Sequence, residues 1–145
     1  MKILIINGPN MNMLGIREPE IYGHTTYADL IQMIIDAKGS KHELDFMQSN
    51  HEGDLVDAIH QAYFDKVEGI VMNPAAYTHT SVALADAIKA VGIPTIEVHV
   101  SDPDTRDDFR RISYVRDVAA GVVKGKGLQG YIDAIDLLEA LNTAK

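Results

Sequence analysis

The sequence predicts a single domain spanning residues 1–145, an α/β sandwich with helices on both faces of a five-stranded parallel sheet. Two observations support this prediction. Short runs of consecutive aliphatic and β-branched residues are typical of strands that are covered on both faces, as the strands of parallel sheets are. Segments with apolar residues at helical spacing separate these runs, and this alternation indicates right-handed crossovers between parallel strands.

Five segments have the composition of buried strands. The first, 2–6, is mostly Ile and Leu, and it stops at the turn residues Asn7-Gly8-Pro9-Asn10. The others are 44–47, which is the weakest, 69–72, 95–100 and 119–123. Five strands in a chain of 145 residues favour a flavodoxin-like strand order over a six-stranded Rossmann sheet.

Four apolar stripes at helical spacing predict the helices. Their members are Tyr27, Leu30, Ile31 and Ile34; Leu55, Val56, Ile59 and Tyr63; Leu84, Ala85, Ile88 and Val91; and Leu128, Tyr131, Ile132, Ile135 and Leu138. Thr26 with Asp29 three residues later predicts a capping box at the start of the first helix. Gly39 and Gly92 follow the first and third stripes as stop signals.

Two connections, 7–25 and 101–117, are longer than the 2–6 or so residues that α/β loops usually need. Both follow the carboxyl end of a strand, which is where open α/β sheets bind their ligands. Three polar residues, Asn7, Asn73 and His99, also stand at or next to strand ends. We therefore expect the active site at this edge of the sheet.

Glu97 and His99 are the most informative pair of polar residues. Residues two apart on a strand share a face, so a carboxylate and an imidazole lie side by side in a strand expected to be buried. A buried charge needs a partner, and Glu97 is expected to hold one ring nitrogen of His99 and leave the other free. The pair fits an oriented acid–base histidine and fits a structural core ion pair equally well.

Further candidates lie in the segments beside these strand ends. His79 precedes the third helix, and Thr78 or Thr80 is the expected cap of that helix. Arg17 and Tyr22 share the first long connection. A tyrosine titrates near about pH 10, and a cation within about 6 Å lowers its pKa by roughly 1–3, so Tyr22 beside Arg17 is a candidate general base.

Composition excludes several other classes of function. There is no cysteine, so disulfides, thiolate catalysis and cysteine-ligated metals are excluded. A formal charge of −8 argues against nucleic acid and anionic membranes as partners. No apolar run approaches the roughly 18 residues needed to cross a bilayer, and a cytoplasmic location is expected. The Gly-rich stretch 125–130 matches a dinucleotide fingerprint, but too little chain follows it to complete that site, so we interpret it as a tight turn.

Several ordered motifs resemble those of type II 3-dehydroquinate dehydratases, and the match extends from residue 3 to about residue 138. The motifs are Asn7-Gly8-Pro9-Asn10-Met11-Asn12-Met13-Leu14-Gly15, Arg17-Glu18-Pro19, Tyr22-Gly23, 73–81, 96–101, Phe109-Arg110 and 125–131. The resemblance implies a flavodoxin-like fold and dehydration of 3-dehydroquinate to 3-dehydroshikimate. In this family the reaction is an anti elimination through an enolate, without cofactor or metal.

The resemblance also implies roles for individual residues. Tyr22 is the implied base that removes the proton beside the ketone, and Arg17 supports the tyrosinate. His99, oriented by Glu97, is the implied acid for the departing hydroxyl, and Asn12 places a water that stabilises the enolate. The implied substrate contacts are Asn73, His79, Asp86, the Val100–Ser101 pair and Arg110.

The family resemblance changes one assignment and adds a partner. The residues alone favour Arg110 as the partner of the substrate carboxylate, whereas the family implies the backbone N–H groups of Val100 and Ser101, with Arg110 on ring hydroxyls. The family also implies a homododecamer built as a tetramer of trimers, in which Asp86 reaches a neighbouring subunit's site. The reaction serves aromatic amino acid synthesis or quinate breakdown.

Several positions depart from the family pattern. Met11 and Met13 stand where the family usually has Leu, a change that conserves volume. Ala75 replaces a usual Gly beside Asn73, and Asp102 replaces a usual Asn, which adds negative charge next to the expected carboxylate site. Arg116-Asp117 also differs from the usual pattern.

Two functions of other classes are weaker alternatives. A flavodoxin-like signalling or flavin-binding module would need acidic residues at the strand ends or a Ser/Thr-rich phosphate loop, and neither is present. A metal hydrolase using His24, His79 and His99 would have to assemble its ligands from separate loops, because no pair of histidines has H-x-x-x-H spacing.

Overall fold

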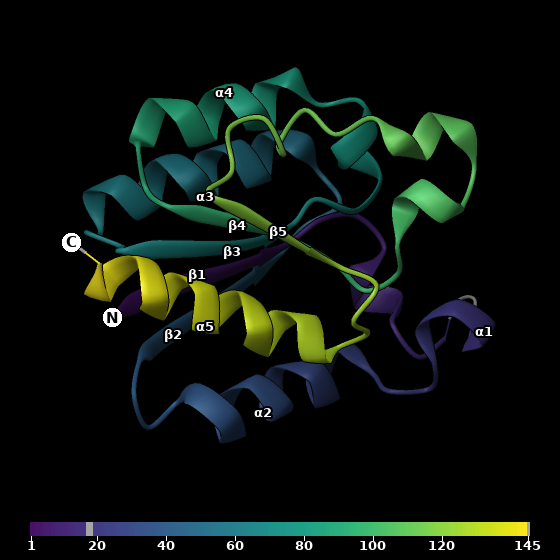
Figure 1. Ribbon diagram of the computed structural model, residues 1–145, viewed down its shortest axis with the longest axis horizontal. Helices are drawn as coiled ribbons and strands as arrows, with labels where there is room; N and C mark the ends of the chain where they lie inside the picture. The colour runs from purple at the N-terminus through teal and green to yellow at the C-terminus, as the bar shows by residue number, and fades with distance from the viewer. Residues whose placement is uncertain (17–18, 145) are drawn as a thin grey trace.

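A computed structural model describes residues 1–16 and 19–144, apart from the side chains at 21 and 22. Its centre is a five-stranded parallel sheet in the order β2-β1-β3-β4-β5, which confirms the predicted fold class (Figure 1). The strands are β1 (Lys2–Asn7), β2 (Glu43–Gln48), β3 (Gly69–Asn73), β4 (Thr95–His99) and β5 (Gly121–Lys124). Because β1 and β3 pair with Asn7 opposite Asn73, their polar carboxyl ends lie side by side.

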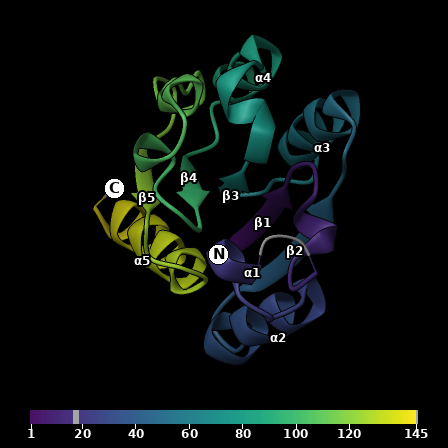
Figure 2. The ribbon, with the colours of Figure 1, turned by 90° about the vertical axis from the view of Figure 1, so that its right-hand side faces the viewer.

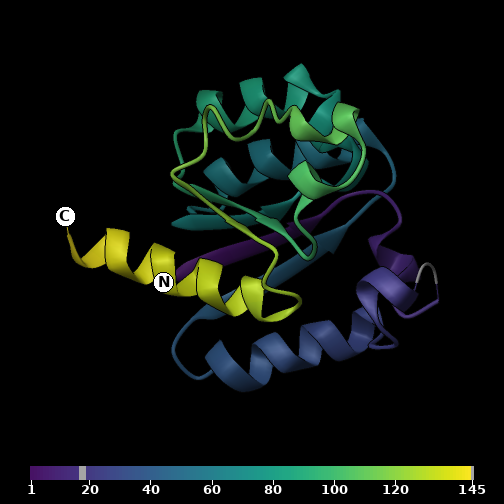
Figure 3. The ribbon, with the colours of Figure 1, turned by 45° about the vertical axis from the view of Figure 1, so that its right-hand side comes forward.

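Four longer helices cover the two faces of the sheet (Figures 1 and 3). One layer holds α2 (Tyr27–Lys38) and α5 (Gln129–Thr143), and the other holds α3 (Glu52–Phe64) and α4 (Val82–Val91). The central strands supply both cores: Ile3 and Ile5 of β1 pack in the cluster with α2 and α5, whereas Leu4 and Ile6 pack in the cluster with α3 and α4. Both faces of β1 are therefore apolar, which is why its sequence does not alternate.

The helix boundaries follow local signals with two corrections. The predicted capping box of α2 is present, with Thr26 and Asp29 each bonding the other's backbone N–H. The cap of α4 is Ser81, not Thr78 or Thr80, because its Oγ accepts a hydrogen bond from the Leu84 N–H at 3.0 Å. Tyr63 does not belong to the buried stripe of α3: its side chain is 59% exposed, and Ala62 is buried in its place.

The two long connections are not irregular loops throughout. The first contains η1 (Met11–Met13) and α1 (Pro19–Tyr22), and the second contains η3 (Pro103–Thr105) and η4 (Asp108–Arg111). Sequence periodicity misses such elements because a helix of three or four residues has no complete apolar stripe.

The Gly-rich stretch 125–130 forms the predicted turn after β5 with residues 125–128 and begins α5 with Gln129 and Gly130. Gly125 and Gly127 adopt positive φ angles of 71° and 61°, which side chains other than glycine seldom tolerate. A Cβ on Gly130 would lie 3.3 Å from a methyl carbon of Val123, so this position permits close packing of the helix on the sheet.

Candidate active site

A cavity of about 140 Å³ opens at the carboxyl edge of the sheet, the edge that faces the viewer in Figure 2. We call it the carboxyl-edge cavity. Its walls come from the segments that follow β1, β3 and β4, and its lining residues are Pro9, Asn10, Met11, Asn73, Ala75, Ala76, His79, His99, Val100, Ser101, Pro103, Arg106 and Arg110. The cavity therefore brings together six of the predicted site residues, which come from separate parts of the chain.

Glu97 and His99 form the predicted pair at the end of β4. Glu97 Oε2 lies 2.5 Å from His99 Nε2, and the Glu97 side chain is fully buried. Because Nε2 of the ring faces the carboxylate, Nδ1 is the nitrogen left for other partners. His99 lines the carboxyl-edge cavity, so its ring links a buried carboxylate to the space where a ligand can bind.

Several groups hold Glu97 in its charged form. Burial alone would raise the pKa of this carboxyl group, but the hydrogen bond and charge of His99, the Ser113 hydroxyl and the positive charge of Arg116 outweigh it. The pKa of Glu97 is therefore below its ordinary value. Ser113 Oγ donates to Glu97 Oε1 at 2.7 Å, a contact that the sequence analysis missed because a serine in a charged loop has no distinguishing pattern.

Asn73 is held at the end of β3 by a buried network. Its Nδ2 donates to the Tyr131 hydroxyl at 3.0 Å, and that hydroxyl donates to Asn7 Oδ1 at 2.5 Å. Asn73 Oδ1 accepts from the Ala75 N–H at 3.0 Å. Ala75 has a φ of 53°, in the left-handed region that favours glycine, so the departure noted in the sequence introduces backbone strain beside Asn73.

His79 and Arg110 are two further polar residues that line the carboxyl-edge cavity. His79 Nδ1 donates to the Ile112 carbonyl at 2.7 Å, which leaves Nε2 as the acceptor of a neutral ring. Burial lowers the pKa of His79 below its ordinary value; the hydrogen bond to Ile112 opposes this shift and the nearby charge of Arg110 adds to it. Arg110 bonds Asp107 through Nε at 3.2 Å and lies over the Phe109 ring.

The Val100–Ser101 segment is anchored to the Gly-rich turn. The carbonyls of Ser101 and Val100 accept from the N–H groups of Gly125 and Gly127 at 3.2 and 3.0 Å. The carboxylate of the neighbouring Asp102 caps η3 and lies 3.7 Å from Lys124 Nζ, which also bonds Asp104, so Lys124 offsets only part of the charge of Asp102. The sequence showed the added charge of Asp102 but not its partner on β5.

Other predicted residues lie elsewhere or fall outside the described residues. Asn12 is exposed on η1, where its Oδ1 accepts from Gln48 at 3.4 Å, and it does not line the carboxyl-edge cavity. Asp86 is exposed on α4 and does not line it either. Arg17 lies outside the described residues, as does the side chain of Tyr22. Arg106 does line the cavity, although the sequence analysis did not include it among the site residues; the four arginines of the 101–117 connection were the available indication.

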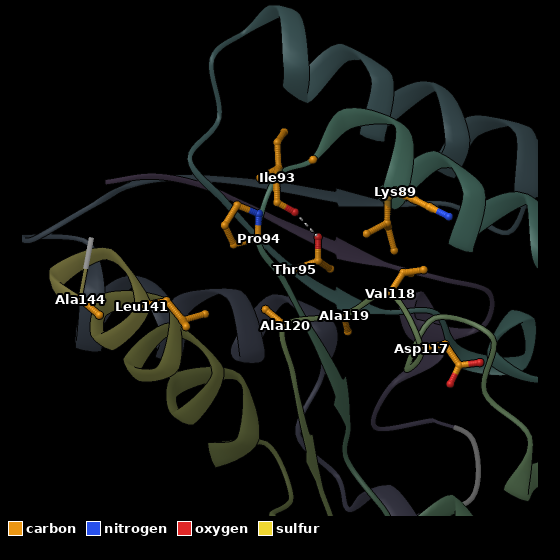
Figure 4. Close-up of a pocket in the computed structure, with 12 residues that line it drawn as sticks. Lys89, Ile93, Pro94, Thr95, Asp117, Val118, Ala119, Ala120, Leu141 and Ala144 are labelled. Carbon is orange, nitrogen blue, oxygen red and sulfur yellow. Dashed lines mark hydrogen bonds between the residues drawn. The ribbon is translucent and has the colours of Figure 1, made fainter.

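A second, larger hollow of about 710 Å³ lies at the opposite edge of the sheet (Figure 4). Its walls are mostly apolar or small, and the Thr95 hydroxyl is already bonded to the Ile93 carbonyl at 3.0 Å. Lys89 and Asp117 are its charged residues, and no histidine lines it. We therefore assign the chemistry to the smaller carboxyl-edge cavity, where acid–base groups converge.

Two further classes of site have no support in the described residues. Among residues 1–16 and 19–144, no three His, Asp or Glu side chains are grouped as a metal ion would require, and His24 does not line the carboxyl-edge cavity. Within the same residues, no helix has the length and apolar character needed to cross a bilayer.

Comparison with known proteins gives consistent results. Residues 1–139 match the model of the family described as dehydroquinase class II. The chain is 52% identical to a Corynebacterium efficiens protein named 3-dehydroquinate dehydratase 1, over 94% of this chain and 91% of that one. It is 50% identical to the 3-dehydroquinate dehydratase of Caldicellulosiruptor bescii, over 97% of each chain. The crystal structure of a type II dehydroquinase from Butyrivibrio crossotus superimposes with a TM-score of 0.93 at 51% identity, covering 96% of this chain and 97% of that one.

Proposed function

The chain belongs to the class II dehydroquinase family, and from this premise we propose that it is a hydro-lyase that dehydrates 3-dehydroquinate to 3-dehydroshikimate. The observation that best supports the proposal is the carboxyl-edge cavity, where a buried Glu97–His99 pair meets Asn73, Ser101 and Arg110. These groups suit a small, polyhydroxylated carboxylate whose hydroxyl must be protonated before it leaves as water.

We propose an anti elimination in two steps. A base removes the proton from the carbon beside the ketone, and the electron pair moves toward the ketone oxygen to form an enolate. His99 then donates a proton to the departing hydroxyl, and the enolate collapses to the conjugated enone. The ionised carboxylate of Glu97 supports this role of His99, because it stabilises the protonated ring before the transfer.

The proposed base is Tyr22, supported by Arg17. Tyr22 is the last residue of α1, a short helix in the connection that leaves the carboxyl end of β1 (Figure 1). The guanidinium of Arg17 is proposed to lower the pKa of the tyrosine and stabilise the tyrosinate. Asn12 of η1 is proposed to position a water that donates to the enolate oxygen.

The proposed substrate contacts follow the walls of the carboxyl-edge cavity. The substrate carboxylate is assigned to the backbone N–H groups of Val100 and Ser101, and the ring hydroxyls to Asn73, His79 and Arg110. Lys124, shared between Asp102 and Asp104, offsets part of the negative charge of Asp102 beside the carboxylate position. No cofactor and no metal is required by this mechanism.

The proposal includes self-association and a cellular context. We propose a homododecamer built as a tetramer of trimers, in which Asp86 reaches a neighbouring subunit's cavity; its exposure on α4, away from its own chain's cavity, is compatible with that role. The proposed location is the cytoplasm. The reaction is assigned to the shikimate pathway or to quinate breakdown, and neither nucleic acid nor membrane is a proposed partner.

The test is a spectrophotometric assay with 3-dehydroquinate in the presence of chelator, in which the ultraviolet absorbance of the enone product reports turnover. The assay is repeated after borohydride treatment with substrate, which would trap an imine. We expect turnover to survive both treatments and to fall severely in Tyr22→Phe and Arg17→Ala with assembly intact. Absence of turnover in the folded protein would overturn the proposed function, and near-normal turnover in either variant would remove that residue from the mechanism.

A further inference from the structure

Ser113 lies behind the acid–base pair, in the connection between η4 and β5. Its Oγ donates to Glu97 Oε1 at 2.7 Å, while Oε2 of the same carboxylate lies 2.5 Å from His99 Nε2. Each oxygen of Glu97 therefore has its own hydrogen-bond partner. Glu97 is fully buried, so water is not available to replace a partner that is lost.

The direction of the Ser113 hydroxyl is set by its surroundings. Ser113 Oγ accepts a hydrogen bond from the Arg116 backbone N–H at 3.1 Å, which closes a local turn. A hydroxyl that accepts from one side and has a carboxylate on the other can satisfy both only by pointing its hydrogen at the carboxylate. The bond to Glu97 is thus specified by the backbone of the turn.

The segment that carries Ser113 is itself attached to the cavity wall. The Ile112 carbonyl accepts from His79 Nδ1 at 2.7 Å, and the Tyr114 N–H donates to the Thr78 carbonyl at 3.2 Å. The bonds on either side of Ser113 therefore tie its backbone to η2 (Ala75–His79), so that the serine is presented to Glu97 from a fixed position.

We propose that Ser113 is a positioning residue for the elimination, which holds the plane of the Glu97 carboxylate and through it the orientation of the His99 ring. Without Ser113, Glu97 could rotate about its terminal bond and His99 would lose a fixed partner. For its effect on turnover the inference rests on the proposed function. Its effect on the His99 ring does not depend on any substrate.

The charged and titratable groups around Glu97 define what a pH profile will report. They are His99 on β4, Arg116 in the same turn as Ser113, and His79 on η2. The Ser113 hydroxyl is one of the groups that lower the pKa of Glu97, so its removal raises that pKa. As the pH is lowered, Ser113→Ala therefore loses the activity that needs ionised Glu97 at a higher pH than the wild type does.

The experiment compares Ser113→Ala and Ser113→Thr with a matched control, Ser49→Ala. Ser49 has the same bonding pattern at a carboxylate that does not line the carboxyl-edge cavity: its Oγ donates to Asp54 at 2.8 Å and accepts from the His51 N–H at 2.9 Å. We expect Ser113→Ala to lower kcat roughly 10- to 100-fold, the loss typical of a slightly misplaced catalytic group, with KM within about twofold. Ser113→Thr keeps the hydroxyl and restores most of the activity, whereas Ser49→Ala lowers the unfolding temperature without changing kcat.

Two further measurements separate positioning from a general structural effect. The acidic limb of the kcat profile is expected to move to higher pH in Ser113→Ala only, and NMR of ¹⁵N-labelled histidine is expected to show a changed His99 ring signal. An unchanged kcat, pH profile and His99 signal in Ser113→Ala would overturn the inference, as would an equal loss of kcat in Ser49→Ala. If the wild type does not turn over 3-dehydroquinate, the proposed function fails, and the His99 signal alone decides the role of Ser113.

Discussion

Replacing Tyr131 by Phe tests the buried network that holds Asn73 at the cavity. The Tyr131 side chain is fully buried, and burial raises the pKa of its hydroxyl well above the ordinary value, so the hydroxyl remains a donor. Without this hydroxyl, Asn7 Oδ1 loses its hydrogen-bond donor at 2.5 Å, and Asn73 Nδ2 loses its acceptor at 3.0 Å. Within the described part of the chain, Asn73 Nδ2 then keeps only a weak contact with Met11 Sδ at 3.5 Å.

The expected cost follows from the two groups left behind. A buried polar group without its partner costs about 1–3 kcal/mol, and two such groups, one of them with a weak substitute, give about 2–4 kcal/mol for Tyr131→Phe. Because the free energy of unfolding falls by about 2 kcal/mol per molar urea, the urea concentration at the unfolding midpoint is expected to fall by roughly 1–2 M. Protein concentration must be held constant, because self-association adds to the apparent stability.

A control variant lies in the same network. The Tyr27 hydroxyl accepts from Asn7 Nδ2 at 3.5 Å, a long bond at a half-buried site, so Tyr27→Phe is expected to cost less than about 1 kcal/mol. We also expect KM to rise in Tyr131→Phe, because Asn73 lines the carboxyl-edge cavity. The reasoning is refuted if the urea midpoint of Tyr131→Phe falls no further than that of Tyr27→Phe.

Three other predictions concern the backbone and the acid–base pair. A Cβ on Gly8 would lie 2.4 Å from the Pro74 carbonyl oxygen, so Gly8→Ala should lower the free energy of unfolding, measured in urea, by at least about 1–3 kcal/mol. Gly53 occupies an open helical position, so Gly53→Ala should raise that free energy by up to about 1 kcal/mol. Equal effects of the two substitutions would contradict this prediction. Ala75→Gly relieves a left-handed backbone and should raise stability by up to about 1 kcal/mol, and a lower unfolding temperature would count against it. The pKa of Glu97 is lower in the folded protein than its ordinary value of 4.5. The stability that its charge contributes to the fold is therefore fully present above pH 4.5 and is lost as the pH falls below 4.5 toward the folded-state pKa. The stability difference between wild type and Glu97→Gln should shrink over that range, and a difference independent of pH would exclude this contribution.

Local patterns in the sequence predicted the elements well. The apolar run 2–6 indicated a strand covered on both faces, and β1 does supply both cores. The Thr26–Asp29 spacing predicted a capping box because the two bonds involve only residues three apart. Where a neighbouring residue offered the same chemistry, the prediction was wrong: Ser81 caps α4 although Thr78 and Thr80 are also good caps, since the choice depends on where the preceding 3₁₀ turn ends.

The site was predictable to the extent that it lies on strand ends or in recognisable motifs. Residues two apart on one strand must share a face, so the contact of Glu97 with His99 could be stated from the sequence. The carboxyl-edge cavity likewise follows from strands that are parallel and end in polar residues. The catalytic roles of Tyr22 and Arg17 remain predictions from the family motif.

The sequence by itself thus determined the sheet, the edge at which the site lies and the Glu97–His99 pair, because each depends on periodicity or on contacts within one element. Only the tertiary structure identified Ser113 beside Glu97, Lys124 beside Asp102, and Tyr131 between Asn7 and Asn73. Each of these contacts joins residues from different elements. Which of them meet is decided by how helices and loops pack on the sheet, and that packing depends on the shapes of all the buried side chains together rather than on any local pattern.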